Sequence, residues 1–517
     1  MRSLLNAAGR SAPWRGSAWF LSVLLLSCVL LLALWGGRAD RSAAQEVIGP
    51  LAASAAGETS LVQHTDPSTS TAASSLASAA VEAGSTVSHT VYLPVIFGIP
   101  EPLPFGVQVN HIEPRTTSGA ANAGADWVRM RLRWDAIEPE NTTPEKFRWS
   151  PGLDQELASY ADNGVRVLLT IMGNPDWAAT YPAGPIDKVD IGELAQFMQA
   201  VVSRYGAPPY NVKHWEMYNE PDNTTEWRAA DGFGYFGDNP QAYVDLLEAV
   251  YQAMKEADPA AQVVFGGMAY DGWESGFSES FLDDVLAIMQ ANGQYPFDAM
   301  NFHYYPLFAS KWEAYGLGID IIAKTNYIRN KMSEYGADKP LICTETSMWS
   351  NCIDENVEVL CGSDEKQSRY VPQVYARSRA AGLEFSIWYM LYDVDEVWAW
   401  DYGLLDANLN PKLSHQAYLT LGRHLLGTDY SRTLSLSETG SNEIEAYEFL
   451  ERNTTERVVV AWSNDGVDYQ MRLRGASLVR VGKYGDKVTI YDGDDGQADG
   501  YVVVTIGPSP VYLRLDK

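Results

Sequence analysis

The segment His214–Asn223, HWEMYNEPDN, is an apolar run that ends in an amide, a carboxylate and a proline. The residues before Asn219 have the composition of a buried strand. Asn219 and Glu220 therefore stand where the predicted strand leaves the core. Polar side chains at that position indicate a fold in which several strand ends meet at a common site.

Short apolar runs of this kind alternate with longer amphipathic stretches from Leu103 to Gly427. The amphipathic stretches carry apolar residues at three- and four-residue spacing, which predicts helices such as Ile191–Gly206, Pro240–Asp258 and Ile319–Gly336, with the first near Thr116–Ala125. This repetition predicts an α/β fold, a parallel (β/α)8 TIM barrel. An open doubly wound sheet is the alternative, but no glycine-rich phosphate loop follows the first strand. The predicted strands are FGVQVN from Phe105, WVRMRL from Trp127, VRVLLTI from Val165, VKHWEMYN from Val212, QVVFGG from Gln262, FDAMNFH from Phe297, PLICTE from Pro340 and EFSIWYM from Glu384.

The chemistry of such a barrel lies at the C-terminal ends of its strands. Strands four and seven each end in a carboxylate, Glu220 and Glu345. Two carboxylates facing each other suit cleavage of a glycosidic bond, because one protonates the leaving oxygen while the other meets the developing oxocarbenium ion. We therefore expect the polar and aromatic residues at the strand ends to converge on one site. They are Arg129, Asn219, Glu220, His303, Tyr305, Glu345 and Trp388.

The motifs WEMYNEPD, HYY, CTETSMW and IWYM at strands four, six, seven and eight resemble the clan A glycoside hydrolases, retaining enzymes on a (β/α)8 barrel. The resemblance covers about Leu103 to Gly427. It implies Glu220 as general acid/base and Glu345 as nucleophile, a carbohydrate substrate and no cofactor. The other implied roles are Asn219 on the substrate 2-hydroxyl, Tyr305 and His303 around the nucleophile, Arg129 beneath it and Trp388 as a sugar platform.

Within the clan, GNPDWA from Gly173 and the HWEMYNEP context are similar to family 39 and its relatives, which include β-xylosidases. Family 5 is the other near neighbour. Family 5 enzymes usually carry a histidine at the end of strand three, where this chain has Gly173 and Asn174. The resemblance therefore favours family 39.

Two other classes of function compete with a glycosidase. A metal-dependent hydrolase needs clustered ligands, but of seven histidines only His303 ends a predicted strand, with His111 just past another, so we expect no metal site. A non-catalytic sugar-binding barrel needs aromatic faces but no carboxylate pair. The tryptophans that suit binding of a glycan are Trp177, Trp227, Trp349 and Trp388.

The charge of the chain narrows the choice of partner. A formal net charge of −28 gives a surface that repels polyanions, so nucleic acid is excluded as a partner. The chain also contains 16 Trp and 29 Tyr, which provide flat faces that can stack on sugar rings.

The N-terminal segment 1–44 has the layout of an export signal. Three arginines precede an uncharged run from Trp19 to Trp35, and small residues at Ser42–Ala44 offer a cleavage site. An uncleaved anchor is the alternative, and the membrane is then a partner only through this segment. Either reading predicts a secreted or cell-surface protein. Residues 45–102 are rich in Ala, Ser and Thr and are predicted to form a disordered tether before a catalytic barrel of residues 103–427.

The cysteines beyond the signal fall into two kinds. Cys343 lies in an apolar run and is predicted to be a buried strand residue. Cys352 and Cys361 lie in a polar loop, where an oxidising compartment allows a disulfide between them. Two free loop thiols are the alternative.

After Gly427 the hydrophobic period changes to two, with turns rich in Gly, Asn and Asp. Residues 428–517 are therefore predicted to form a small antiparallel β-sandwich. Its predicted role is packing rather than sugar binding through Trp462 or Tyr484. The acidic segment from Asp492 lacks the ligand spacing of a calcium loop and is predicted to be a solvated turn.

Overall fold

The computed structural model describes residues 104–110, 114–224, 235–269, 271, 276–353, 360–394, 400–452, 454 and 456–515, without the side chains of 114–117. The predicted export signal and tether lie outside the described residues, and so do His111 and Trp227. No helix in the described ranges combines the length and apolar character needed to cross a membrane.

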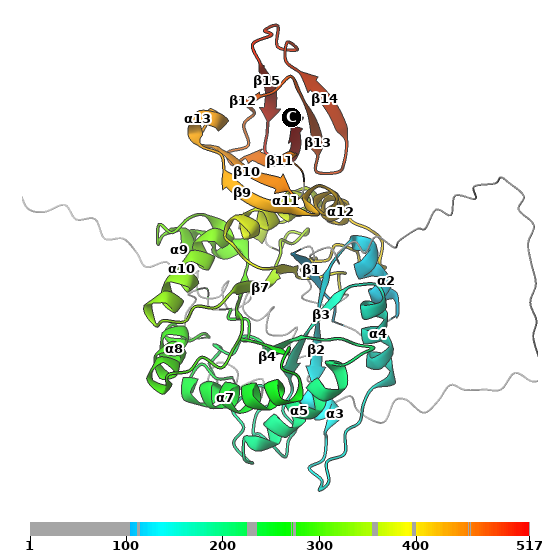
Figure 1. Cartoon of the computed structure of the whole chain (residues 1–517), viewed down its shortest axis with the longest axis vertical. Helices are drawn as coiled ribbons and strands as arrows, with labels where there is room; N and C mark the ends of the chain where they lie inside the picture. Colours follow the sequence, from blue (N-terminus) through cyan, green and yellow to red (C-terminus); the bar gives the residue numbers. More distant parts are fainter. Residues whose placement is uncertain are drawn as a thin grey trace, which may run out of the picture. The chain divides into compact units, whose positions relative to one another are not determined.

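Among the described residues, eight parallel strands form the predicted barrel, with helices around it (Figure 1). Neighbouring strands pair in the order β5-β4-β3-β2-β1-β8-β7-β6. Two isolated parallel bridges, Val264 with Ala299 and Met268 with Phe302, connect β5 to β6 and complete the ring. The strands are β1 Phe105–Gln108, β2 Trp127–Arg133, β3 Arg166–Met172, β4 His214–Met217, β5 Gln262–Val264, β6 Met300–Tyr304, β7 Leu341–Thr346 and β8 Ser386–Trp388.

Some of the helices begin at a side-chain cap. In α7 (Pro240–Ala257) the side chain of Asn239 caps the backbone N–H of Ala242 at 3.2 Å, and Pro240 occupies the first turn. The first predicted helix is found as α2, slightly earlier in the chain than expected. The other helices of the barrel are α2 Pro114–Ala123, α3 Trp134–Ile137, α4 Pro151–Asp162, α5 Gly192–Tyr205, α8 Phe281–Asn292, η1 Pro306–Phe308, α9 Ala309–Glu313, α10 Asp320–Glu334, α11 Asp364–Ala380 and α12 Leu413–Leu425.

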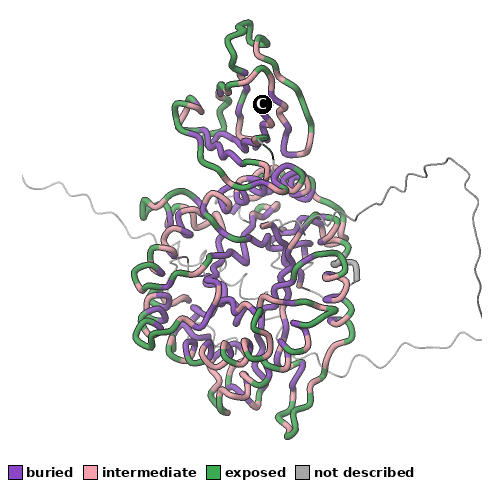
Figure 2. The backbone as a smooth tube through the Cα atoms, in the orientation of Figure 1, coloured by how far each residue is buried: buried purple, intermediate pink, exposed green. Residues whose placement is uncertain are grey.

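The barrel interior is apolar at one end and polar at the other. Buried residues run along the strands and the inner faces of the helices (Figure 2). At the N-terminal end, Trp127 stacks on Phe385 with ring centroids 4.1 Å apart, within an apolar cluster that also contains Leu168 and Ile342. A Cβ at Gly106 would lie 2.7 Å from the Cβ of Trp127, so this packing requires glycine there. The polar side chains lie at the C-terminal ends of the strands.

The segment after Gly427 forms the predicted antiparallel β-sheets. One sheet has the order β14-β13-β16-β11-β10-β9, and β12 pairs with β15. Apolar side chains from both sheets, including Val459 and Val504, form their common core. Trp462 is fully buried, and the segment from Asp492 is exposed, as expected for packing and for a turn. The elements are β9 Thr428–Thr433, α13 Leu436–Thr439, β10 Ile444–Glu451, β11 Arg457–Ser463, β12 Tyr469–Arg474, β13 Ser477–Gly482, β14 Lys487–Tyr491, β15 Tyr501–Ile506 and β16 Val511–Leu515.

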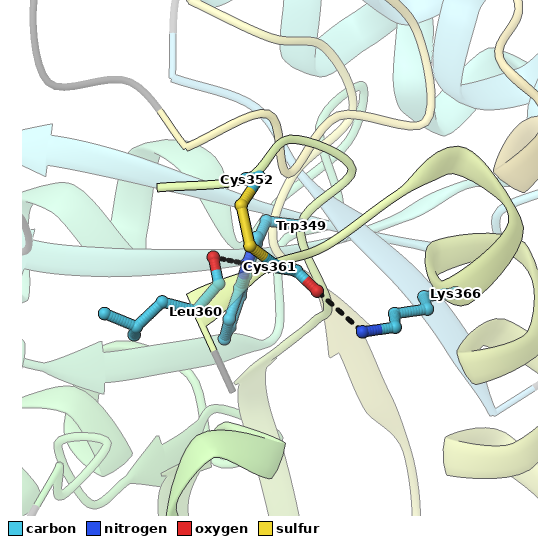
Figure 3. Close-up of a disulfide and its surroundings, with 5 residues drawn as sticks. All are labelled: Trp349, Cys352, Leu360, Cys361 and Lys366. Carbon is cyan, nitrogen blue, oxygen red and sulfur yellow. Dashed lines mark hydrogen bonds between the residues drawn. A yellow bond between two sulfur atoms is a disulfide. The ribbon is translucent and has the colours of Figure 1, made fainter. Parts of the chain in front are cut away.

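The loop after β7 is closed by a disulfide between Cys352 and Cys361 (Figure 3). The backbone carbonyl beside it, on Leu360, accepts a hydrogen bond from the indole Nε1 of Trp349 at 3.1 Å. The carbonyl of Cys361 accepts one from Lys366 Nζ at 2.8 Å. The base of the loop is therefore tied to the barrel. Cys343, in β7, is a buried free thiol.

Candidate active site

Glu220 and Glu345 face each other at the barrel mouth. One carboxylate oxygen of each and a ring nitrogen of His303 all lie within 4.8 Å of one another. Both glutamates are buried, with exposed fractions of 8% for Glu220 and 5% for Glu345. The carboxyl groups of a retaining glycosidase are about 5 to 5.5 Å apart, whereas an inverting enzyme needs about 6.5 to 9.5 Å. The short separation therefore fits a retaining pair.

The backbone at the end of β4 turns Glu220 into the mouth. Glu220 has φ +49° and Tyr218 has φ +66°, a left-handed conformation that is unfavourable for such residues and that clusters at functional sites. The N–H of Glu220 donates to the carbonyl of Gly267 at 3.0 Å, which fixes the turn. A Cβ at Gly266 would lie 2.6 Å from the carbonyl oxygen of Met217, so the turn also requires glycine beside it.

Glu345 is surrounded by groups that stabilise its ionised form. Arg129 donates from Nη1 to Oε1, and the hydroxyl of Tyr305 donates to Oε2 at 3.1 Å. Burial opposes ionisation, but the positive charges of His303, Arg129 and Arg131 outweigh burial and hold the pKa of Glu345 below its usual value. The carboxylate is therefore suited to act as a nucleophile.

Glu220 has different partners. Nδ1 of His303 lies 3.1 Å from Oε1 of Glu220 and 3.7 Å from Oε2 of Glu345. Asn223 donates from Nδ2 to the other Glu220 oxygen at 3.4 Å. His303 therefore lies beside the predicted nucleophile, as expected, but between the two carboxylates and closer to Glu220. A Cβ at Gly267 would come within 2.2 Å of its Nε2, so the imidazole needs glycine there.

Asn219 is oriented by Arg129. Its carbonyl oxygen Oδ1 accepts a hydrogen bond from Arg129 Nη2 at 2.7 Å. Since the oxygen is occupied, the NH2 of the amide is the group that can donate to a ligand. This orientation suits contact with a sugar hydroxyl.

The tryptophans do not all lie as expected. Trp388 is fully buried and donates from Nε1 to the carbonyl of Tyr402 at 2.9 Å. Trp349 is also buried, edge-on to Trp400 at a centroid distance of 4.3 Å. A sugar platform needs an accessible ring face, so the expectation is wrong for both residues in this structure. Trp177 is only half-buried; its Nε1 donates to the carbonyl of Glu138 at 3.1 Å.

A buried polar cluster that the strand patterns did not indicate lies beneath the carboxylate pair. Its centre is Glu216, on β4, which is fully buried and accepts hydrogen bonds from Arg129 Nε at 2.6 Å and Nη2 at 3.0 Å. The signal was present, because a charged residue stands between Trp215 and Met217 in an apolar run. The other members of the cluster are Gln108, Thr170, Asn301 and Thr344.

The carboxylate pair is also where a cation would find ligands among the described residues. Glu220, His303 and Glu345 together offer ligand atoms close enough to hold a metal ion. However, the guanidinium of Arg129 donates to Glu345, and its positive charge disfavours a second cation there. The donor set fits acid and nucleophile chemistry better than metal binding.

Comparisons with known proteins identify the family of this chain. Residues 99–389 match the family model described as Cellulase (glycosyl hydrolase family 5). None of the curated proteins matches the sequence significantly.

Several solved structures share the fold. A family 39 glycoside hydrolase from Bacteroides cellulosilyticus WH2 is similar with 19% identity and a TM-score of 0.61, over 80% of this chain and 81% of that one. A glucosidase from Croceicoccus marinus has 15% identity and a TM-score of 0.58, over 80% of this chain and 97% of the other. A family 39 β-xylosidase from Caulobacter crescentus has 16% identity and a TM-score of 0.52, over 81% and 97%. At such identities these similarities show the fold alone.

Proposed function

Since the chain belongs to the cellulase family, glycosyl hydrolase family 5, whose members are retaining enzymes of clan A, we propose that Glu220 is its general acid/base and Glu345 its nucleophile. Clan A is the clan that the sequence motifs predict. The family model that matches is that of family 5, whereas the motifs favoured family 39. Gly173 and Asn174, which follow β3 in place of the usual histidine, are therefore a departure within family 5.

The proposed reaction has two displacements. Glu345 attacks the anomeric carbon while Glu220 protonates the departing glycosidic oxygen, which leaves a glycosyl ester on Glu345. Glu220 then removes a proton from water as that water cleaves the ester and restores the carboxylate. The observation that carries this proposal is the approach of the two carboxylates to within 4.8 Å, with the guanidinium and phenol donors on Glu345 only.

The neighbouring side chains take supporting roles in the proposal. Asn219 presents its NH2 to the substrate 2-hydroxyl, a contact that strengthens in the transition state. Tyr305 and Arg129 hold Glu345 in its attacking position, and His303 holds Glu220. No metal or cofactor takes part.

The proposed substrates are β-linked glycans or oligosaccharides, with β-xylosides and related β-glycosides first. The motifs around Gly173 and Glu220 support this choice, and the similar structures include proteins named as a β-xylosidase and a glucosidase. We also propose that the protein is exported, on the strength of the arginines and the uncharged run in residues 1–44.

A panel of aryl substrates tests the proposal: β-xyloside, β-glucoside, β-mannoside, β-galactoside and α-arabinofuranoside. We expect hydrolysis of at least one β-glycoside, with the β anomer formed first by NMR. Hydrolysis of none, combined with binding of a glycan, would favour the non-catalytic barrel. An inverted first product would contradict the proposed roles of the two glutamates.

A further inference from the structure

Glu216 is a third carboxylate below the catalytic pair, and the proposed mechanism gives it no role. It lies in β4, fully buried, between Trp215 and Met217 in sequence. An ionised carboxylate in such a place is unfavourable unless hydrogen bonds and an opposite charge compensate it. The structure supplies both, which raises the question of what the arrangement achieves.

The opposite charge is Arg129, and its guanidinium is fully occupied. Nε and Nη2 form a two-point contact with the carboxylate of Glu216, at 2.6 Å and 3.0 Å. Nη2 also donates to Asn219, and Nη1 donates to Gln108 and Glu345. Every N–H of the guanidinium therefore has an acceptor, and the contact with Glu216 defines the plane of the guanidinium.

Glu216 is itself anchored to four other strands or strand ends. Thr170 of β3 donates to Oε2, and Oε1 accepts from Asn301 of β6 at 2.7 Å and from Thr344 of β7 at 3.1 Å. The backbone N–H of Gly267, after β5, donates to the same oxygen at 3.0 Å. A carboxylate held from so many directions has one available position. Glu216 therefore fixes the position of Arg129.

We propose that Glu216 is a positioning residue of the glycosidase reaction, which holds Arg129 against Glu345 and Asn219 and takes up part of its positive charge. The inference rests on the proposed function, because it acts through the nucleophile and the 2-hydroxyl contact. It assigns Glu216 no contact with the substrate.

The negative charge of Glu216 affects the pKa of the nucleophile, Glu345. Burial opposes the charge of Arg129, but Glu216 and Glu345 outweigh burial and raise the pKa of its guanidinium. If the charge of Glu216 is removed, a negative charge near Glu345 is lost while the positive charge of Arg129 remains. This change favours the ionised form of Glu345 and lowers its pKa further. A more strongly held carboxylate is a weaker nucleophile.

The other ionisable groups around Glu345 stay in place in such a variant. They are Arg129 and Arg131 on β2, Glu220 after β4, His303 on β6, Tyr305 after β6 and Cys343 on β7. A change in the pH profile of a Glu216 variant therefore reports on Glu216 itself.

The test compares Glu216→Gln with Glu156→Gln in the full chain. Glu156, on α4, is a buried glutamate that accepts a hydrogen bond from Tyr160 at 3.1 Å and lies outside the site. The substrate is the aryl β-glycoside that the wild type hydrolyses best. We expect Glu216→Gln to lower kcat about 10-fold with little change in KM, because Arg129 keeps its place and the carboxylate of Glu345 becomes a weaker nucleophile. The acidic limb of kcat/KM should move to lower pH. Glu156→Gln should keep the wild-type rate and profile.

A folded Glu216→Gln protein with the kinetics and pH profile of the Glu156→Gln control would overturn the inference. If Glu216→Gln does not fold, Glu216→Asp carries the test, since it keeps the charge and withdraws the carboxylate from Arg129. That variant should lose kcat while its acidic limb stays in place, and an unchanged kcat would overturn the inference. A wild type that cleaves no glycoside refutes the proposed function instead, so the two failures are distinct.

Discussion

A carboxylate oxygen of Glu220, after β4, and one of Glu345, in β7, lie within 4.8 Å of each other. The two glutamates have unequal surroundings. Glu345 is held by a guanidinium and a phenol, and Glu220 by an imidazole and an amide. This asymmetry supports the proposed roles of Glu345 as nucleophile and Glu220 as acid/base, and it leads to the following predictions.

Tyr305→Phe should reduce kcat/KM by about 10- to 100-fold, because it removes a hydrogen bond to the ionised nucleophile. The lost donor stabilised the ionised form, so the pKa of Glu345 should rise and the acidic limb should move to higher pH. Rates across pH on an aryl β-glycoside measure this. Tyr315→Phe, at a ring that is 50% exposed, is the control and should match the wild type. An unmoved limb in Tyr305→Phe would contradict the role of the phenol.

Glu220→Ala should lose the most activity on substrates whose leaving group must be protonated as it departs. Aryl glycosides with acidic phenols should be cleaved to the ester at nearly the wild-type rate, and the ester should then accumulate because no general base remains. Added azide should raise the turnover rate and yield a β-glycosyl azide, identified by NMR. Equal losses on acidic and basic leaving groups would count against Glu220 as the proton donor.

Arg377→Met should destabilise the chain by about 3 to 5 kcal/mol, the cost of breaking a buried ion pair on one side. Arg377, on α11, donates to both oxygens of Glu445 on β10, at 3.0 Å and 2.6 Å, and also pairs with Asp320. Urea unfolding measures the loss. Arg432→Met, at a more exposed pair with Glu448, should cost about 1 kcal/mol or less. Similar losses in both variants would refute the importance of the buried pair.

The stability of the chain should also fall in acid through Glu445. Burial opposes its ionisation, but Arg377 outweighs burial and holds the pKa of Glu445 below the usual value. A lowered folded-state pKa stabilises the fold above the unfolded-state value, and this stabilisation is lost as the pH falls through the folded-state value. Unfolding curves from pH 7 down to about pH 3 should therefore show a smaller acid loss in Glu445→Gln than in the wild type. An equal acid loss in both would contradict this account.

Cys352 and Cys361 should resist alkylation until a reductant is added. Closing a short loop, with a sequence separation of 9, stabilises the fold by about 2 to 3 kcal/mol, so reduction should lower the Tm. Mass spectrometry after alkylation of exported protein tests the pairing, with buried Cys343 as the internal reference. Modification of both loop thiols without reductant would refute it.

Much of the barrel follows from the sequence because its strands are continuous apolar runs. Trp127, Leu168 and Ile342 are buried at one end of the barrel, so the polar residues of the same strands fall at the other end. Glu220 and Glu345 could be found in this way, since each ends an apolar run.

The contacts between side chains could not be read from the strands alone. Glu216 is stabilised by partners from several other strands, and no single strand pattern shows that they meet. Trp388 is covered because its indole reaches the carbonyl of Tyr402, which follows it in the chain. In the C-terminal sheets, the sequence of β9, TDYSRT, does not indicate a strand, because it is largely polar and exposed and lacks an apolar alternation.

The central claim is that Glu345 forms a covalent ester with the sugar. The most direct measurement is mass spectrometry of peptides after treatment with a 2,4-dinitrophenyl 2-deoxy-2-fluoro-β-glycoside of the sugar preferred in the panel. The fluorine slows the second displacement, so the ester should accumulate, and we expect one fluorosugar on the peptide that contains Glu345. A label on Glu220 or another residue, or full hydrolytic activity with no label and an inverted first product, would contradict the account.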